Sequence, residues 1–183
     1  MSPHRWLALG LAIALFVGFV WAVKAFFRRD TDGDLRLGMQ TIALGGALTI
    51  GLHVGALALA PEVSWGLGLA ALQIYALALW VFWSAVWANR AQPLAIAFSE
   101  VEPEHLVTRG PYAYVRHPFY LAYSLAWFAG FAATGQLWLL ATVMGMGALY
   151  LRAARMEEAT FVAGPLGLDY AAYRQRTGMF LPR

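Results

Sequence analysis

Two groups of charged residues stand where the end of a helix ordinarily disfavours them. Arg116 and His117 come directly before Pro118, which suits the first position of a helix because its missing N–H costs nothing there. Cations at that end oppose the helix dipole. With Arg109 nearby and the free backbone N–H groups of a helix start, they could receive a carboxylate or a phosphate. Extension of these arginines to lipid headgroups is the alternative, and both interpretations stay open.

The second group is the acidic pair Glu157 and Glu158, which follows a long apolar run and should lie close to the C-terminal end of a helix. Acids are disfavoured there. Glu158 could pair with Arg155 at i,i+3 on a continuing helix, and Glu157 would then be left for a cationic ligand. Anion-receiving groups beside two carboxylates would suit a zwitterionic cation. S-adenosylmethionine, with a carboxylate, an ammonium and a sulfonium, has that charge pattern.

The two groups can meet only if the chain between them folds back. No charge occurs in the 35 residues from His117 to Leu151. As a single helix this run would be about 52 Å long, against a hydrocarbon core of about 30 Å. The polar, helix-weakening stretch Thr134-Gly135-Gln136 lies at its middle. We therefore predict a hairpin of two spans, over residues 118–133 and 136–151, that returns both charged groups to one membrane surface.

The composition places the rest of the chain in a bilayer as well. Of the 183 residues, 61% are hydrophobic and 13% are charged, whereas a soluble domain carries about 25% charged residues. Three more apolar runs predict spans over 6–27, 37–60 and 63–88. Arg5 before the first run resembles the start of a signal peptide, but the length of the run and the lack of a small-residue cleavage site favour a span.

The expected fold is therefore an all-α integral membrane protein with about five transmembrane helices, forming one membrane domain over 1–183 and ending in a cytoplasmic helical tail. Twelve of the thirteen Lys and Arg residues fall on one side of these spans. The positive-inside rule makes that side cytoplasmic, with the N-terminus outside and the C-terminus inside. We do not expect nucleic-acid binding, because the cations lie at membrane boundaries and form no known basic motif.

Other polar residues have simpler interpretations. His53 lies mid-span and could ligate haem, but no second histidine occurs at that depth, so we expect a hydrogen bond between helices; Gln40 and Gln73 are interpreted in the same way. The acidic residues at 30, 32 and 34 lack the glutamate of a calcium loop and predict a solvated turn. No cysteine or metal-ligand cluster is present, and no metal site is predicted. A Gly51-x-x-x-Gly55 motif leaves the oligomeric state open.

Several motifs of the C-terminal half occur together in a known family. They are Gly110-Pro111-Tyr112, Arg116-His117-Pro118-Phe119-Tyr120, Glu157-Glu158, Leu166-Gly167, Tyr170, Tyr173 and Leu181-Pro182. In these residues the chain resembles the integral-membrane isoprenylcysteine carboxyl methyltransferases and phospholipid N-methyltransferases. The resemblance covers roughly residues 105–183, while the first three spans match only as spans. The Arg-His-Pro segment and the later Glu-Glu pair are together fairly specific.

The resemblance implies an S-adenosylmethionine-dependent methyltransferase whose cofactor site faces the cytosol and whose lipophilic acceptor, an isoprenylcysteine-like carboxylate or a phospholipid amine, enters from the surrounding membrane lipids. By position it implies cofactor contacts at Val107, Thr108, Gly110, Tyr112, His117, Tyr120, Glu157, Leu166, Tyr170 and Tyr173. It implies catalytic roles for Arg116, Glu157 and Glu158, with Arg116 orienting an anionic substrate group. An amine acceptor must also lose a proton, which Glu157, Glu158 or His117 could take.

Two other functions remain as alternatives. Membrane sterol reductases, which use NADPH, share an Arg-His-Pro segment but continue with Asn-Tyr and then an acid, where this chain has Phe119 and Tyr123. That difference favours the methyltransferase. A non-catalytic factor that binds anionic lipid through its arginine-rich face is the third interpretation, and its affinity would fall steeply with salt.

Overall fold

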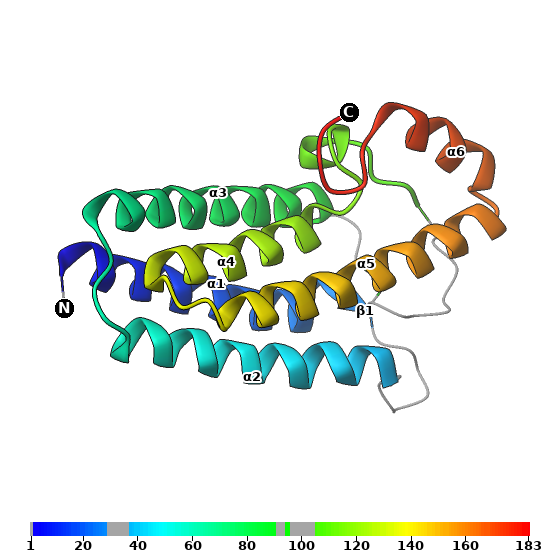
Figure 1. The fold of residues 1–183 in the computed structure, drawn as a ribbon. Coiled ribbons are helices and arrows are strands. Elements are labelled where there is room, and N and C mark those ends of the chain that lie inside the picture. The colour runs from blue at the N-terminus through cyan, green and yellow to red at the C-terminus, as the bar shows by residue number, and fades with distance from the viewer. Residues whose placement is uncertain (1, 29–36, 91–93, 96–104) are drawn as a thin grey trace.

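The computed structural model describes residues 2–28, 37–90, 94–95 and 105–183, and these parts are almost entirely helical (Figure 1). The α-helices are α1 (Pro3–Phe26), α2 (Leu37–Leu59), α3 (Trp65–Asn89), α4 (Pro118–Thr134), α5 (Leu139–Ala163) and α6 (Gly167–Arg176), with a 3-10 helix η1 (Gly110–Ala113). Two-residue strands β1 (Phe27–Arg28) and β2 (Leu94–Ala95) pair in parallel. The all-helical architecture confirms the predicted class.

Three helices, α1, α2 and α3, are long and apolar enough to cross a membrane. They begin and end within three residues of the predicted spans. Whether α4 and α5 cross as well, and so whether the chain has five spans, stays a prediction. The acidic turn at residues 30–34 lies outside the described residues.

The hairpin between α4 and α5 forms where the sequence breaks. Pro118 is the first residue of α4, as predicted, and Gly135 follows its last residue with φ of 64°, a left-handed conformation that glycine adopts without strain. However, α5 does not end at residue 151 but continues to Ala163. Burial of Ala153 and Ala154 continues past the first charge, so the helix follows its packing partner beyond the apolar run. Glu157 and Glu158 therefore lie within α5.

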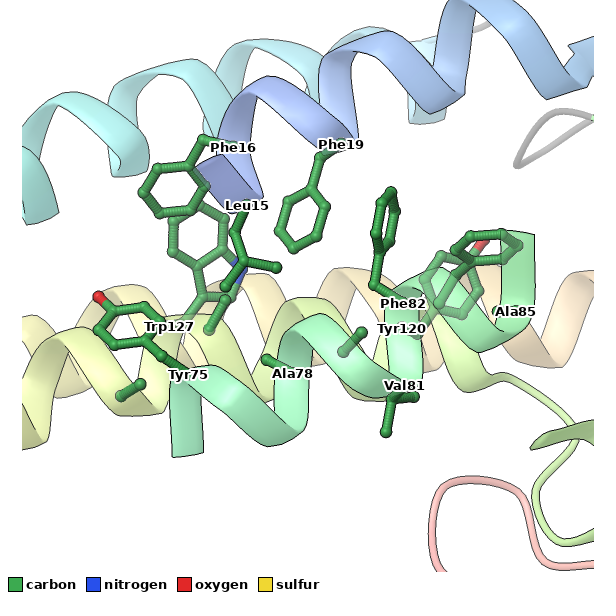
Figure 2. Packing of buried hydrophobic residues seen from close by; sticks show 14 of the residues in the cluster. Leu15, Phe16, Phe19, Tyr75, Ala78, Val81, Phe82, Ala85, Tyr120 and Trp127 are labelled. Atoms are coloured by element: carbon green, nitrogen blue, oxygen red, sulfur yellow. The ribbon is translucent and has the colours of Figure 1, made fainter. Parts of the chain in front are cut away.

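Helix α3 packs closely along α4 and α1 through small residues. Ala71, Ala78 and Ala85 on α3 face a core to which α4 contributes Ala122 and Ala126, and all five are fully buried. Small side chains allow helix backbones to approach closely in a membrane. Larger aromatic rings fill the remaining space, as Figure 2 shows for Phe19 against Phe82 and for Phe16 stacked on Trp127.

Helix α2 is fixed at two points by polar side chains from other helices. Arg5 of α1 is buried and donates from Nε to the Leu57 carbonyl at 2.5 Å and from Nη2 to the Ala56 carbonyl at 3.1 Å. These carbonyls lie in the last turn of α2, where helix C=O groups begin to lose their partners within the helix, although Ala56 also accepts from the Ala60 N–H at 2.9 Å. The positive charge also suits the negative end of the helix dipole.

The second fixed point is His53, whose Nε2 lies 2.9 Å from Thr142 Oγ1 on α5. The predicted hydrogen bond between helices is thereby confirmed for His53. Gln40 and Gln73, for which the same bond was predicted, are exposed instead. A Cβ added at Gly45 would lie 3.4 Å from Met146 Sδ, whereas a Cβ at Gly51 or Gly55 would meet nothing within 4 Å.

Candidate active site

The fold brings the two charged groups together at one end of the bundle, as the hairpin predicts. Glu158 of α5 is their centre. Its Oε1 accepts a hydrogen bond from Arg116 Nε at 2.8 Å and lies 3.2 Å from His117 Nε2, while Oε2 lies 3.7 Å from Arg174 Nε. Glu158 therefore pairs with three groups that are distant in the sequence, and not with Arg155 of its own helix.

Glu157 is the more accessible of the two carboxylates. Its Oε1 accepts a hydrogen bond from the Tyr120 hydroxyl, and its Oε2 lies 3.5 Å from His117 Nδ1. The side chain is 30% exposed, against 6% for Glu158. His117 therefore stands between two carboxylates, one enclosed by protein and the other open to a ligand.

This arrangement shifts the pKa of both central groups toward the charged state. Burial would raise the pKa of Glu158, but hydrogen bonds from His117 and Arg116, together with their charges, lower it to about 2. Burial likewise would lower the pKa of His117, yet its hydrogen bonds to Glu157 and Glu158 raise the pKa above the ordinary value. The Glu158 carboxylate is thus ionised at neutral pH, and its contact with His117 favours the protonated imidazole.

The Arg116 guanidinium is bound mainly to protein groups. Besides Glu158, it donates from Nη1 to the Thr177 carbonyl and, at 3.4 Å, to the Arg174 carbonyl, and its side chain is 8% exposed. The backbone follows the same path, because Arg116 N–H donates to the Gly178 carbonyl at 2.9 Å. Arg116 therefore holds the C-terminal segment, residues 177–180, against the start of α4.

The C-terminal segment also contacts His117 directly. The His117 N–H donates to the Met179 carbonyl at 3.2 Å, and the Phe180 ring lies 6.0 Å from the imidazole. A parallel bridge joins Val115 to Gly178. Sequence reasoning missed these residues, and no side-chain pattern marks contacts that run through backbone groups.

The loop before α4 closes on the end of α3. Arg109 donates from Nε and Nη2 to the Ala88 carbonyl, at 3.2 and 3.1 Å, so the structure places it there and not beside Arg116. Gly110 has φ of 61° and lies so close to α3 that a Cβ would come within 3.3 Å of Ala88 Cβ. Tyr112 is buried against Asn89, whose Nδ2 lies 2.9 Å from its hydroxyl.

Helix α6, which carries the last of the predicted site residues, folds back toward the loop before α4 (Figure 1). Tyr170 stacks on Phe161 of α5 with ring centroids 4.8 Å apart, and Tyr173 donates from its hydroxyl to the Tyr112 carbonyl at 2.6 Å. Leu166 precedes the helix as its N-cap residue. The remaining loop residues differ in exposure: Val107 packs against the core and Thr108 is exposed.

Two further tyrosines, which sequence reasoning did not select, adjoin Tyr120. Tyr150 stacks on it with centroids 5.3 Å apart and accepts a hydrogen bond from Trp127 Nε1 at 3.1 Å. Tyr123 lies one turn along α4, with its ring 5.6 Å from that of Tyr150. The spacing of Tyr120 and Tyr123 by three residues on one helix face was the available signal.

The described helices thus form an apolar bundle with a charged cluster at one end of the hairpin between α4 and α5. Comparison with known families gives its class: the family described as phospholipid methyltransferase matches residues 62–165. The chain belongs to this family and is therefore a membrane methyltransferase. A search of curated proteins found no match. The family match includes all of α3, η1, α4 and α5, and it ends just before α6.

Proposed function

We propose that this protein transfers a methyl group from S-adenosylmethionine to a lipophilic acceptor that reaches the site from the bilayer. The acceptor is an isoprenylcysteine-like carboxylate or a phospholipid amine. The observation that supports this most is the open carboxylate of Glu157, held by Tyr120 and His117 beside a buried ion pair. Membership of the phospholipid methyltransferase family supplies the reaction class.

The residues present fit S-adenosylmethionine by charge. Glu157 offers a partly exposed carboxylate to an ammonium group. When bound, the cofactor supplies a methyl group carried on a positively charged sulfur, which keeps the bonding electron pair when the acceptor attacks the carbon. Chemistry of this kind depends mainly on holding the two reactants in line and away from water.

The two glutamates have different parts in the proposed reaction. Glu158 has a pKa of about 2 and is bound to three cations, so it is a poor proton acceptor and serves as a positioning residue for His117. An amine acceptor would lose its proton to Glu157, the carboxylate open to ligands. A carboxylate or thiolate acceptor needs no base. The site faces the cytosol in this proposal, because twelve of the thirteen Lys and Arg residues fall on that side of the predicted spans.

Calorimetry with S-adenosylhomocysteine in detergent tests the cofactor. We expect wild-type protein to bind it and Glu157→Gln to weaken binding at least about tenfold, because a charge-assisted hydrogen bond is lost. Glu62→Gln is the matched control, since that carboxylate binds the Ser2 backbone at the opposite end of the bundle. Absence of binding by the wild type would overturn the proposal, and equal binding by Glu157→Gln would overturn the site.

Mass spectrometry of lipids after incubation with isotope-labelled S-adenosylmethionine identifies the acceptor. A labelled amine-bearing phospholipid selects N-methylation, and a labelled prenylated carboxylate selects O-methylation. A labelled water-soluble product alone would contradict entry from the bilayer.

A further inference from the structure

Asn89, the last residue of α3, has a hydrogen-bond acceptor that the protein leaves unused. The residue is 1% exposed. Its Nδ2 donates to the Ala85 carbonyl at 2.7 Å and to the Tyr112 hydroxyl at 2.9 Å, which occupies both amide hydrogens. Its Oδ1 has no partner within the described parts of the chain. Because buried polar atoms are nearly always hydrogen-bonded, this carbonyl oxygen points to a ligand.

The bond from Asn89 also determines what Tyr112 can offer. A phenol has one hydrogen to donate, and its oxygen accepts the bond from Nδ2. The Tyr112 hydrogen therefore stays available, with no acceptor among the described residues. The acceptor Oδ1 of Asn89 and the hydroxyl of Tyr112 lie side by side, because Nδ2 of the same amide is bonded to that hydroxyl.

This pair adjoins the candidate active site. The Tyr112 carbonyl accepts the hydrogen bond from Tyr173, and the negative charge of Glu157, after burial, contributes to the raised pKa of the Tyr112 phenol. The pair is also fixed in place, because Arg109 and Gly110 hold the loop against Ala88 one residue before Asn89. A rigid, uncharged donor and acceptor thus lie close to the charged cluster but apart from it.

We propose that Asn89 and Tyr112 recognise the adenine ring of the cofactor, with Asn89 Oδ1 accepting from the exocyclic amino group and the Tyr112 hydroxyl donating to a neighbouring ring nitrogen. This inference rests on the proposed function. Adenine presents an amino donor next to a ring-nitrogen acceptor, the complement of this pair. The ammonium group of the cofactor finds its partner elsewhere, at Glu157, so an uncharged pair is left for its uncharged end.

Comparison of two probes by calorimetry tests this assignment: S-adenosylhomocysteine and S-inosylhomocysteine, in which a carbonyl oxygen replaces the amino group. Wild-type protein should prefer the adenosine compound by about tenfold or more, because the carbonyl would face the unpaired Asn89 oxygen. Asn89→Ala should reduce this preference severalfold, and the remainder comes from the ring nitrogen that carries a hydrogen in the inosine compound and faces Tyr112. Tyr112→Phe, which keeps the ring, should weaken S-adenosylhomocysteine binding about tenfold.

Tyr114→Phe is the matched control, because Tyr114 is 66% exposed and lies two residues away. Thermal unfolding of each variant in detergent verifies folding, and Tyr112→Phe provides a test should Asn89→Ala fail to fold. An undiminished preference in Asn89→Ala, or unchanged affinity in Tyr112→Phe, overturns the inference while leaving the proposed function intact. Failure of the wild type to bind S-adenosylhomocysteine overturns both.

Discussion

His117 and His53 both lie at helix interfaces with little exposed surface, and their surroundings differ in kind. The side chain of His117 is 9% exposed and stands between the carboxylates of Glu157 and Glu158. His53 is fully buried between α2, α4 and α5 and has the Thr142 hydroxyl as its partner, with the Trp127 ring 5.2 Å away. Charged groups surround the first histidine, and neutral groups surround the second.

The contacts of Thr142 settle which nitrogen of His53 carries the proton. Thr142 donates its hydroxyl hydrogen to the Leu139 carbonyl at 2.6 Å, so its oxygen is left to accept from His53 Nε2. His53 then donates from Nε2 to Thr142. A histidine bonded to a neutral hydroxyl joins helices, whereas a histidine between carboxylates can take part in charge chemistry.

The largest effect that separates the two histidine environments is expected from Glu158→Ala. Removal of this carboxylate leaves Arg116 and His117 without their buried partner, and breaking a buried ion pair costs about 3–5 kcal/mol. Thr142→Val, which leaves the His53 N–H unbonded, should cost about 1–3 kcal/mol. Thermal unfolding in detergent measures both, with the exposed Arg155→Ala as the control. Equal losses for Glu158→Ala and Thr142→Val would remove the distinction.

The pH dependence of stability is the next largest effect. The pKa of Glu158 is lowered to about 2, so its stabilisation is complete above about pH 4.5 and is lost as the pH falls toward 2, an effect of about 2–3 kcal/mol. The pKa of His117 is raised, so its contribution is complete below about pH 6.5 and declines as the pH rises through the folded-state pKa. Stability from this cluster should peak between these limits.

Melting temperatures across pH 3–8 test this expectation. Glu158→Gln should flatten the acid side of the profile, because the titrating group has been removed. An acid side as steep as that of the wild type would show that other carboxylates control it.

The smallest effect concerns the packing beside His53. A Cβ on Gly130 would lie 2.2 Å from His53 Nδ1, so Gly130→Ala must displace the imidazole and should destabilise the protein by about 1–3 kcal/mol. Gly147→Ala is the matched control, since a Cβ there meets nothing within 4 Å and alanine favours a helix by about 1 kcal/mol. If Gly147→Ala destabilised the protein and Gly130→Ala did not, this result would contradict the close packing around His53.

The helices and their hairpin could be predicted from patterns in the sequence. Apolar runs mark α1 to α3, and Gly135 with its polar neighbours marks the turn between α4 and α5. The end of α5 could not be predicted this way, because the first charge at Arg152 ends an apolar run without ending a helix. What extends α5 is burial of Ala153 and Ala154 against other elements, which depends on the tertiary structure.

The site was predictable where side chains carry its chemistry and unpredictable where the backbone does. Charge and helix-end reasoning selected Arg116, His117, Glu157 and Glu158, and the structure brings all four together. Thr177 escaped selection because it contributes a carbonyl oxygen, which every residue possesses. Asn89 escaped because its significance lies in an unpaired atom, and only the folded structure shows which atoms have partners.

The bonds from Arg5 to Ala56 and Leu57 constrain the order in which the bundle can assemble during synthesis. The guanidinium enters near the start of the chain, yet its acceptors are made 51 and 52 residues later. Until then the positive charge must remain in water or among lipid headgroups, because an unpaired arginine is costly inside a membrane. These two bonds can therefore form only after the second helix has been made, and they then join the two helices as a pair.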